Sequence, residues 1–366
     1  MSGILQSLLA SIGGAGGPGL YAWGLNNFGQ LGDGTLVYKS SPIQIGSETN
    51  WSEVSASGGL AASAIKTNGT IWTWGNGFGG GLGDGTTVNK SSPVQVGALT
   101  NWSKVSVGYH MAAIKTDGTL WTWGYNTQGE LGDNTRVNKS SPVQIGVLTT
   151  WSQVSACLVQ FTAAIKTDGT LWTWGNNGNG QLGDGTTYKR SSPVQIGALT
   201  NWSIVSTGGF SSFAIKTDGT LWAWGFNGYG QFGNNTAVST SSPIQIGALT
   251  NWSKVSAGYT HCAAIKTDGT LWAWGKNQYG QLGTGNVVNR SSPVQIGSGT
   301  DWSVISSGSN FTAAIKTDKT IWTWGRNDLG QIGDNTVVNK SSPVQIGSNA
   351  WSKVSAARGF TIAIED

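Results

Sequence analysis

The chain has 366 residues, of which 57 are glycine and 20 are tryptophan; 10% are charged and the formal net charge is +4. This aromatic content excludes ordinary disorder, and glycine without a three-residue period excludes collagen. Two cysteines are too few for a disulfide framework, no apolar run is long enough for a transmembrane segment, and no block of like charge indicates a nucleic-acid partner.

Residues 1–18 precede the regular part of the chain and form an extension. Five apolar side chains in it fall on one helical stripe, at Ile4, Leu5, Leu8, Leu9 and Ile12. A glycine-rich hinge follows, and no basic residue precedes Lys39, so the basic region of a signal peptide is missing. We expect a docking peptide for a protein partner; weak membrane association and an uncleaved disordered tail are the alternatives.

From about residue 19 the chain repeats one pattern seven times. Trp-Gly pairs recur every 49 to 51 residues, with their tryptophans at Trp23, Trp74, Trp123, Trp174, Trp224, Trp274 and Trp324. Each pair is followed by versions of Gly-x-Asn-x-x-Gly-Gln-Leu-Gly-Asp-Gly-Thr, Ser-Ser-Pro-Val-Gln-Ile-Gly and Asn-Trp-Ser-x-Val-Ser. A fixed period of this length is typical of solenoids and propellers.

Each repeat contains four short segments with strand character, seen at residues 243–246, 252–256, 263–266 and 270–274. The last two flank Asp268-Gly269, a hairpin signal whose two residues are expected to have positive φ. Asp318-Lys319 is the one departure among six such turns. Four strands per repeat, seven times, predict an all-β fold: a seven-bladed β-propeller over residues 19–366.

The two ends of the repeat region complement each other. Residues 361–364 match the strand before the Asp-Gly turn, and residues 19–24 match the strand after it. Pairing of these N- and C-terminal strands would close the ring and leave no open sheet edge between the first and last copies.

At this point the repeat resembles a known family. Residues 171–183, Leu-Trp-Thr-Trp-Gly-Asn-Asn-Gly-Asn-Gly-Gln-Leu-Gly, and residues 255–264 are similar to the regulator of chromosome condensation repeat. The resemblance implies a seven-bladed propeller with a velcro-like closure. The founding member of that family is a nucleotide exchange factor for a small GTPase and binds chromatin, but the even spacing here leaves no room for an inserted loop. Fold alone does not give function.

Near-identical copies show which positions the blade does not require. Variation concentrates in the loops after Trp-Gly and after Val-Ser, and strand direction places both on one face. Aromatic and arginine side chains among glycine, serine and asparagine are typical of binding surfaces. The candidate binding residues are Phe28, Phe78, Tyr109, Tyr125, Phe161, Phe210, Phe226, Tyr229, Tyr259, Tyr279, Phe311, Arg326, Arg358 and Phe360. Packing of some of these aromatics at the channel mouth or between blades is the alternative.

Catalysis and cofactor binding find little support. The Gly-Asp-Gly-Thr loops at Asp33, Asp84 and Asp184 each offer one carboxylate, which favours turn stabilisation over calcium binding. His110 and His261 are expected to pack, and Cys262 is no nucleophile merely because it follows His261. We expect no enzyme, no catalytic residue, no metal and no cofactor.

The leading hypothesis is a non-enzymatic recognition protein: a propeller with a variable aromatic face, tethered through residues 1–18 to a larger assembly that sets its oligomeric state. Low charge and abundant small polar residues suggest a phage or virion appendage that binds a host-surface glycan or protein. The expected location is the virion or the extracellular space, with the cytoplasm as the alternative. A guanine-nucleotide exchange factor and a secreted or envelope-associated bacterial repeat protein are the alternative functions.

Overall fold

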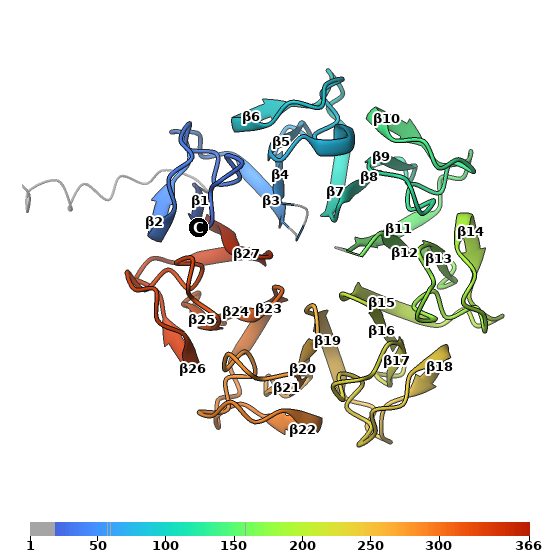
Figure 1. Cartoon of the computed structure of the whole chain (residues 1–366), viewed down its shortest axis with the longest axis vertical. Helices are drawn as coiled ribbons and strands as arrows, with labels where there is room; N and C mark the ends of the chain where they lie inside the picture. The colour runs from blue at the N-terminus through green and yellow to red at the C-terminus, as the bar shows by residue number, and fades with distance from the viewer. Residues whose placement is uncertain (1–18, 57, 59, 158) are drawn as a thin grey trace, which may run out of the picture.

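The computed structural model describes residues 19–366 except 57, 59 and 158, so the docking peptide expected in residues 1–18 lies outside the described residues. Seven four-stranded antiparallel sheets surround a common axis, which confirms the predicted seven-bladed propeller (Figure 1). We number the blades by their Trp-Gly strands in chain order, from β1 in blade 1 to β25 in blade 7. None of the helices within the described part of the chain is long and apolar enough to cross a membrane.

The two strands of each blade nearest the axis come from the Val-Ser and Ala-Ile-Lys segments of the repeat. The inner strands are β3 (Trp51–Ala56), β7 (Trp102–Val107), β11 (Trp151–Ala156), β15 (Trp202–Thr207), β19 (Trp252–Ala257), β23 (Trp302–Ser307) and β27 (Trp351–Ala356). The second strands are β4 (Ala61–Lys66), β8 (His110–Lys115), β12 (Phe161–Lys166), β16 (Ser211–Lys216), β20 (His261–Lys266), β24 (Phe311–Lys316) and β28 (Phe360–Glu365).

The two peripheral strands carry the Trp-Gly pair and the Ser-Ser-Pro segment. The third strands are β5 (Ile71–Gly75), β9 (Leu120–Gly124), β13 (Leu171–Gly175), β17 (Leu221–Gly225), β21 (Leu271–Gly275), β25 (Ile321–Gly325) and β1 (Leu20–Gly24). The outer strands are β6 (Lys90–Gln95), β10 (Lys139–Gln144), β14 (Arg190–Gln195), β18 (Thr240–Gln245), β22 (Arg290–Gln295), β26 (Lys340–Gln345) and β2 (Lys39–Gln44). A 3-10 turn, η1 (Phe78–Gly80), lies in the blade 2 loop. The proline of each outer strand thus sits on a sheet edge, where its missing N–H costs no ladder bond.

The ring closes as the phase of the repeat predicts. Strand β1 pairs antiparallel with β28, from Leu20 opposite Ile364 to Gly24 opposite Phe360. Blade 1 therefore combines β27 and β28 from the C-terminus with β1 and β2 from the N-terminus. This pairing leaves no unpaired strand edge at the seam inside the blade.

The hairpin turns form where expected but with a different backbone from the one expected. In the turn after β4, Gly69 has φ +75 whereas Asn68 is not among the residues of positive φ. Gly69 N–H donates to Lys66 O at 2.8 Å, and Thr70 N–H donates to Asn68 Oδ1 at 3.1 Å. The turn is therefore a type I turn followed by a left-handed glycine, and only the glycine needs positive φ. In the departing copy, Lys319 takes that conformation with φ 69.

Tryptophan fills the space between neighbouring blades. The seven tryptophans of the Trp-Gly pairs have no exposed surface. In six of them the indole N–H donates to a backbone carbonyl of the preceding blade, as Trp174 does to Glu130 O at 2.9 Å and Trp224 to Gln181 O at 2.9 Å. The structural role expected for these residues is confirmed, because all seven pack between blades and six of them also hydrogen-bond across a blade boundary.

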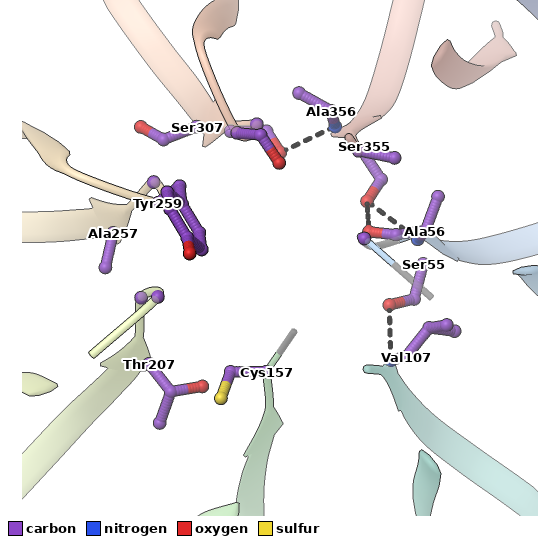
Figure 2. A pocket seen from close by; sticks show the side chains of 18 of the residues that line it. Ser55, Ala56, Val107, Cys157, Thr207, Ala257, Tyr259, Ser307, Ser355 and Ala356 are labelled. Atoms are coloured by element: carbon purple, nitrogen blue, oxygen red, sulfur yellow. Dashed lines mark hydrogen bonds between the residues drawn. The ribbon is translucent and has the colours of Figure 1, made fainter. Parts of the chain in front are cut away.

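A ring of serine hydroxyls joins the inner strands around the axis. Ser355 Oγ accepts from Ala56 N–H at 2.9 Å, and Ser55 Oγ accepts from Val107 N–H at 3.0 Å (Figure 2). The same bond links every inner strand to the next, with the serines at Ser55, Ser106, Ser155, Ser206, Ser256, Ser306 and Ser355. The Val-Ser segment of the repeat therefore closes the ring at its centre as well as building the strand.

Candidate functional site

Both variable loops of each blade lie on the same face of the disc. The second strand begins, and the third strand ends, at this face, and their loops are hydrogen-bonded to each other. Phe226 N–H donates to Phe210 O at 2.9 Å, and Arg326 N–H donates to Asn310 O at 2.9 Å. We call this surface the loop face; it contains the variable loops after the inner strands and after the Trp-Gly pairs.

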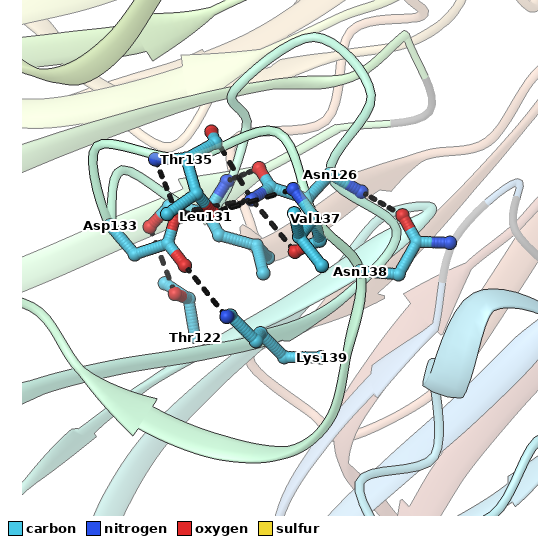
Figure 3. Close-up of polar contacts among 8 residues, drawn as sticks. All are labelled: Thr122, Asn126, Leu131, Asp133, Thr135, Val137, Asn138 and Lys139. Atoms are coloured by element: carbon cyan, nitrogen blue, oxygen red, sulfur yellow. Dashed lines mark hydrogen bonds and ion pairs between the residues drawn. The ribbon is translucent and has the colours of Figure 1, made fainter.

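A buried asparagine holds the loop after the Trp-Gly pair in a fixed shape (Figure 3). Asn126 is fully buried; its Nδ2 donates to Asp133 Oδ1 at 3.1 Å and to Val137 O at 3.1 Å, and its Oδ1 accepts from Leu131 N–H at 3.0 Å. Asp133 Oδ1 also accepts from Thr135 N–H at 3.0 Å. The carboxylate is thus bound within its own loop, in the turn-stabilising role predicted for the equivalent aspartates.

The first aromatic cluster on the loop face spans blades 2 and 3. The Phe78 ring lies 5.6 Å from that of Tyr125, which in turn lies 6.3 Å from that of Tyr109. Phe78 is 60% exposed, and both tyrosines are half-buried. Blade 2 has Gly77 where the other six blades have the buried asparagine, and η1 carries Phe78 outward there.

The second aromatic cluster spans blades 5 and 6. Phe210 contacts Phe226 and Tyr259 with ring centroids 6.3 and 5.7 Å apart, and Phe226 contacts Tyr229 at 6.1 Å. The Lys276 ammonium lies 4.8 Å from the centre of the Tyr229 ring. These rings pack on one another and still keep part of their surface in solvent.

Charge lies beside the second cluster, in blades 6 and 7. The Arg326 guanidinium lies 5.3 Å from the Tyr279 ring and donates to Asp328 Oδ2 at 2.6 Å. That hydrogen bond holds the pKa of Arg326 above its usual value. Of the remaining candidates, Phe28 is half-buried and Arg358 is exposed.

Three predicted loop-face residues belong to the core instead. Phe161, Phe311 and Phe360 have no exposed surface, because each is the first residue of a second strand rather than part of a loop. Each lies opposite a glycine of the third strand, such as Gly175 opposite Phe161, where the missing side chain leaves room for the ring. The packing alternative is the correct one for these three.

Each of the two histidines is the buried first residue of a second strand, a position that holds phenylalanine in three other blades and Ala61 or Ser211 in the remaining two. His110 Nε2 lies 2.6 Å from Thr162 Oγ1, and His261 Nε2 lies 2.9 Å from Thr312 Oγ1. Complete burial lowers the pKa of each imidazole to about 3, so both are neutral at physiological pH. They pack, as expected, and a permanently neutral imidazole is poorly suited to proton transfer.

Neither cysteine has the properties of a reactive thiol. Burial raises the pKa of the Cys157 thiol to about 12 and that of Cys262 well above its usual value. The thiolate is the nucleophilic form, so neither residue is an activated nucleophile. Within the described residues no group of three or more His, Cys, Asp or Glu side chains gathers as a metal site would require.

Glu130 is a buried carboxyl that follows the variable loop after Trp123 in blade 3. It stands where the other repeats, apart from blade 2, have glutamine, and it has no exposed surface. Its Oε2 accepts from Gln128 N–H at 2.7 Å, while Oε1 is buried without a partner among the described residues. Burial raises the pKa of this carboxyl to about 7.

The axial channel holds a small polar cavity of about 130 Å³ (Figure 2). Its lining includes Ser55, Cys157, Thr207, Tyr259 and Ser307, so the seven blades contribute different side chains to one space. The sequence analysis missed this cavity, although the invariant serine of each Val-Ser segment marks the residues that surround it. Its size suits water or a very small polar molecule.

Comparison with protein families gives two matches. The family model described as the RCC1-like domain matches residues 56–364. The model described as the regulator of chromosome condensation (RCC1) repeat matches residues 19–63. Together the two matches cover the whole propeller.

Relatives and solved structures agree with this result. The chain is 30% identical over 196 residues to the human E3 ubiquitin-protein ligase HERC2, which covers 53% of this chain but 3% of that protein. It is 29% identical over 210 residues to the mitochondrial RCC1 domain-containing protein RUG3 of Arabidopsis thaliana, covering 53% of this chain and 47% of that one. The chain thus spans less than half the length of these relatives.

Two solved structures share the fold at low sequence identity. Human WBSCR16 superposes with a TM-score of 0.86 at 18% identity, covering 95% of this chain and 99% of its own. Prp20p of Saccharomyces cerevisiae, described with its binding properties to Gsp1p and histones, gives a TM-score of 0.84 at 18% identity, covering 96% and 92%. At this identity the likeness establishes the architecture alone.

Proposed function

The chain belongs to the RCC1-like domain family, and on this premise we propose that it is a non-enzymatic propeller that binds a protein partner through its loop face. The observation that carries the proposal is the uneven distribution of aromatics on that face. Phe78, Tyr125 and Tyr109 form one cluster, and Phe210, Phe226, Tyr229 and Tyr259 form another, on blades whose frameworks are nearly identical. Aromatic side chains are prominent among the residues that dominate protein interfaces.

The comparisons favour the exchange-factor alternative over the virion appendage, which they do not support, as they do not support host-glycan binding. Prp20p, a propeller of the same architecture, is described as binding Gsp1p and histones. A second candidate function is therefore exchange of guanine nucleotide on a small GTPase held against the loop face. The ligase activity of HERC2 is not carried over, because the match covers 3% of that protein. For the location we propose the cytoplasm, which is the alternative to the virion or the extracellular space.

Site-specific photo-crosslinking tests the first proposal. The full chain would carry benzoylphenylalanine at Phe78 or at Phe226, and matched chains would carry it at Thr217, which is exposed in a turn on the opposite face. In extracts of the source cell we expect the same discrete protein adducts from the two loop-face positions and none from Thr217. Equal adducts from both faces, or none from the loop face, would contradict the proposal.

Nucleotide release tests the second candidate. The full chain would be mixed with Gsp1p loaded with fluorescent GDP and an excess of unlabelled nucleotide. Faster release that is lost on Phe226→Ser would support exchange through the loop face. Unchanged release together with discrete loop-face adducts would favour binding without exchange.

A further inference from the structure

Six lysines, five of them buried and one half-buried, line the face opposite the loop face. Each ends the second strand of a blade and lies against the tryptophans of the inner and third strands, at Lys66, Lys115, Lys166, Lys216, Lys266 and Lys316. The Lys166 ammonium, for example, lies 3.7 Å from the centre of the Trp172 ring and 4.9 Å from that of Trp151. The first five of these lysines are less than 10% exposed. Indole faces attract the cation, but they supply no formal negative charge.

In the first and last blades of this series, blades 2 and 7, a carboxylate of the chain itself pairs with the lysine ammonium. Glu48 Oε2 lies 2.6 Å from Lys66 Nζ, and Asp301 Oδ2 lies 3.2 Å from Lys316 Nζ. Both carboxylates come from the loop that joins the outer strand of one blade to the inner strand of the next. In the seventh copy, at the seam, Glu365 stands in place of the lysine. The position beside the indoles therefore accepts a loop-borne carboxylate in this fold.

The four middle lysines have no such partner. Within the part of the chain that the structure describes, no carboxylate oxygen lies within 4.0 Å of Lys115, Lys166, Lys216 or Lys266. Burial lowers the pKa of each of these four ammonium groups. An aspartate two residues further along each chain segment, at Asp117, Asp168, Asp218 and Asp268, attracts the ammonium from beyond ion-pair distance and partly offsets this lowering. At the position of Glu48 these repeats have half-exposed leucines, at Leu99, Leu148, Leu199 and Leu249. A buried cation without a direct ion pair gains further from an incoming anion.

The cleft at Lys166 shows the space available. It is an open cleft of about 650 Å³ between blades 3 and 4, lined by Lys166, Trp151, Trp172, Leu148 and Gln144 among others. The same lining includes Asp133 and Lys139, which form an ion pair with each other. The site thus combines a cation that has no ion-pair partner within 4.0 Å with an apolar wall, which suits a carboxylate on a short carbon stem.

We propose that the clefts at Lys115, Lys166, Lys216 and Lys266 bind the Asp or Glu side chains of an acidic polypeptide segment. The argument for a polypeptide is the pair of internal occupants, because Glu48 and Asp301 show that a carboxylate carried on a loop fits there. This site lies away from the loop face and does not depend on the function proposed above. Four similar lysine–tryptophan sites on consecutive blades would let successive acidic residues bind together, which raises the apparent affinity of a long segment.

Lysine side-chain NMR of the full chain tests the proposal with a polyglutamate peptide as the probe and polyglutamine of the same length as its control. We expect the resonances of the four middle lysines to shift with polyglutamate and not with polyglutamine. Lys66, which is already paired, and Lys189, which is exposed, should move little. Shifts of equal size at Lys189 would show a general attraction of the peptide to a basic chain and would overturn the proposal. The absence of shifts at the four lysines would overturn it as well.

Two matched variants make this test more specific. Leu148→Glu should place a carboxylate as Glu48 is placed, shift Lys166 without peptide and abolish its response, whereas Leu148→Gln should leave the response intact. Glu48→Gln should make Lys66 respond to polyglutamate, and this exposed substitution tests the proposal even if Leu148→Glu does not fold. A Lys66 that stays silent after Glu48→Gln would contradict the assignment.

Discussion

Tyr125 and Asn126 are neighbours in one loop, yet different constraints decide their identities. Asn126 is buried and bonds three parts of its own loop, and Asn177 and Asn327 make the same bonds in other blades. The position of Tyr125 holds leucine, asparagine, phenylalanine, lysine or arginine elsewhere, and the Tyr125 side chain is half-buried. Six of the seven blades keep the buried asparagine, with Gly77 of blade 2 as the exception, whereas the position of Tyr125 varies and can serve a partner.

Substitution of a buried framework residue should give the greatest loss of stability. Trp224→Ala should lower the free energy of unfolding by about 3–5 kcal/mol, because it empties a fully buried site and removes the bond to Gln181 O. Denaturant unfolding measures this change. Phe226→Ala, two residues away on the loop face, is the matched control and should cost much less. Similar losses for both would erase the distinction between framework and loop face.

Glu130→Gln should remove a pH dependence of stability that comes from the framework and not from the loop face. The folded pKa of about 7 lies above the ordinary value of 4.5, so the stability contributed by the protonated carboxyl is present below pH 4.5 and is lost as pH rises to 7. The free energy of unfolding of the wild-type protein should therefore fall across that pH range. The expected fall is roughly 3 kcal/mol, because one pKa unit corresponds to about 1.36 kcal/mol. The variant, which restores the glutamine of the other blades, should lack this slope. Parallel pH profiles for the two proteins would rule out the buried carboxyl as its cause.

Lys319→Gly should stabilise the protein. Lys319 occupies a left-handed conformation with φ 69 that glycine occupies in the other five turns, and a side chain there costs about 1–2 kcal/mol. The substitution also removes an exposed ion pair with Asp366, which contributes little. The net expectation is a gain of about 1 kcal/mol in unfolding free energy. Lys319→Ala keeps the strain and removes the pair, so it should show no gain.

Phe78→Ser should change stability least. The side chain is 60% exposed and contacts mainly Tyr125, so the change should stay within about 0.5 kcal/mol. Thermal or denaturant unfolding beside wild type checks this. A loss comparable to that of Trp224→Ala would mean that Phe78 packs rather than binds.

The repeat made the architecture readable because its local signals agree with the fold. Asn68-Gly69 marks a hairpin, Trp74 marks a buried strand, and the truncated first and last copies mark the β1–β28 closure. Local order alone was enough for these features, since hairpins and strand phase depend on near neighbours.

Sequence reasoning failed where contacts with residues distant in the sequence decide whether a side chain is buried. Phe161 was counted with the loop aromatics because it varies between copies, but it lies opposite Gly175 inside the blade. The burial of Glu130 and the pairing of Lys66 with Glu48 also depend on neighbours from another strand or blade. Variation between copies marks positions that the fold tolerates, and only coordinates separate those facing solvent from those facing the core.

The most direct test joins stability and binding in one protein. Benzoylphenylalanine at Tyr229 would report partner capture in wild type and in the variant Phe210→Ser, Phe226→Ser, Tyr259→Ser, while unfolding of both is followed in parallel. We expect loss of the adducts with an unfolding free energy changed by far less than the roughly 3–5 kcal/mol of a buried tryptophan. Retained adducts, or a loss of stability of that size, would contradict the claim that the departures from the repeat form the binding surface.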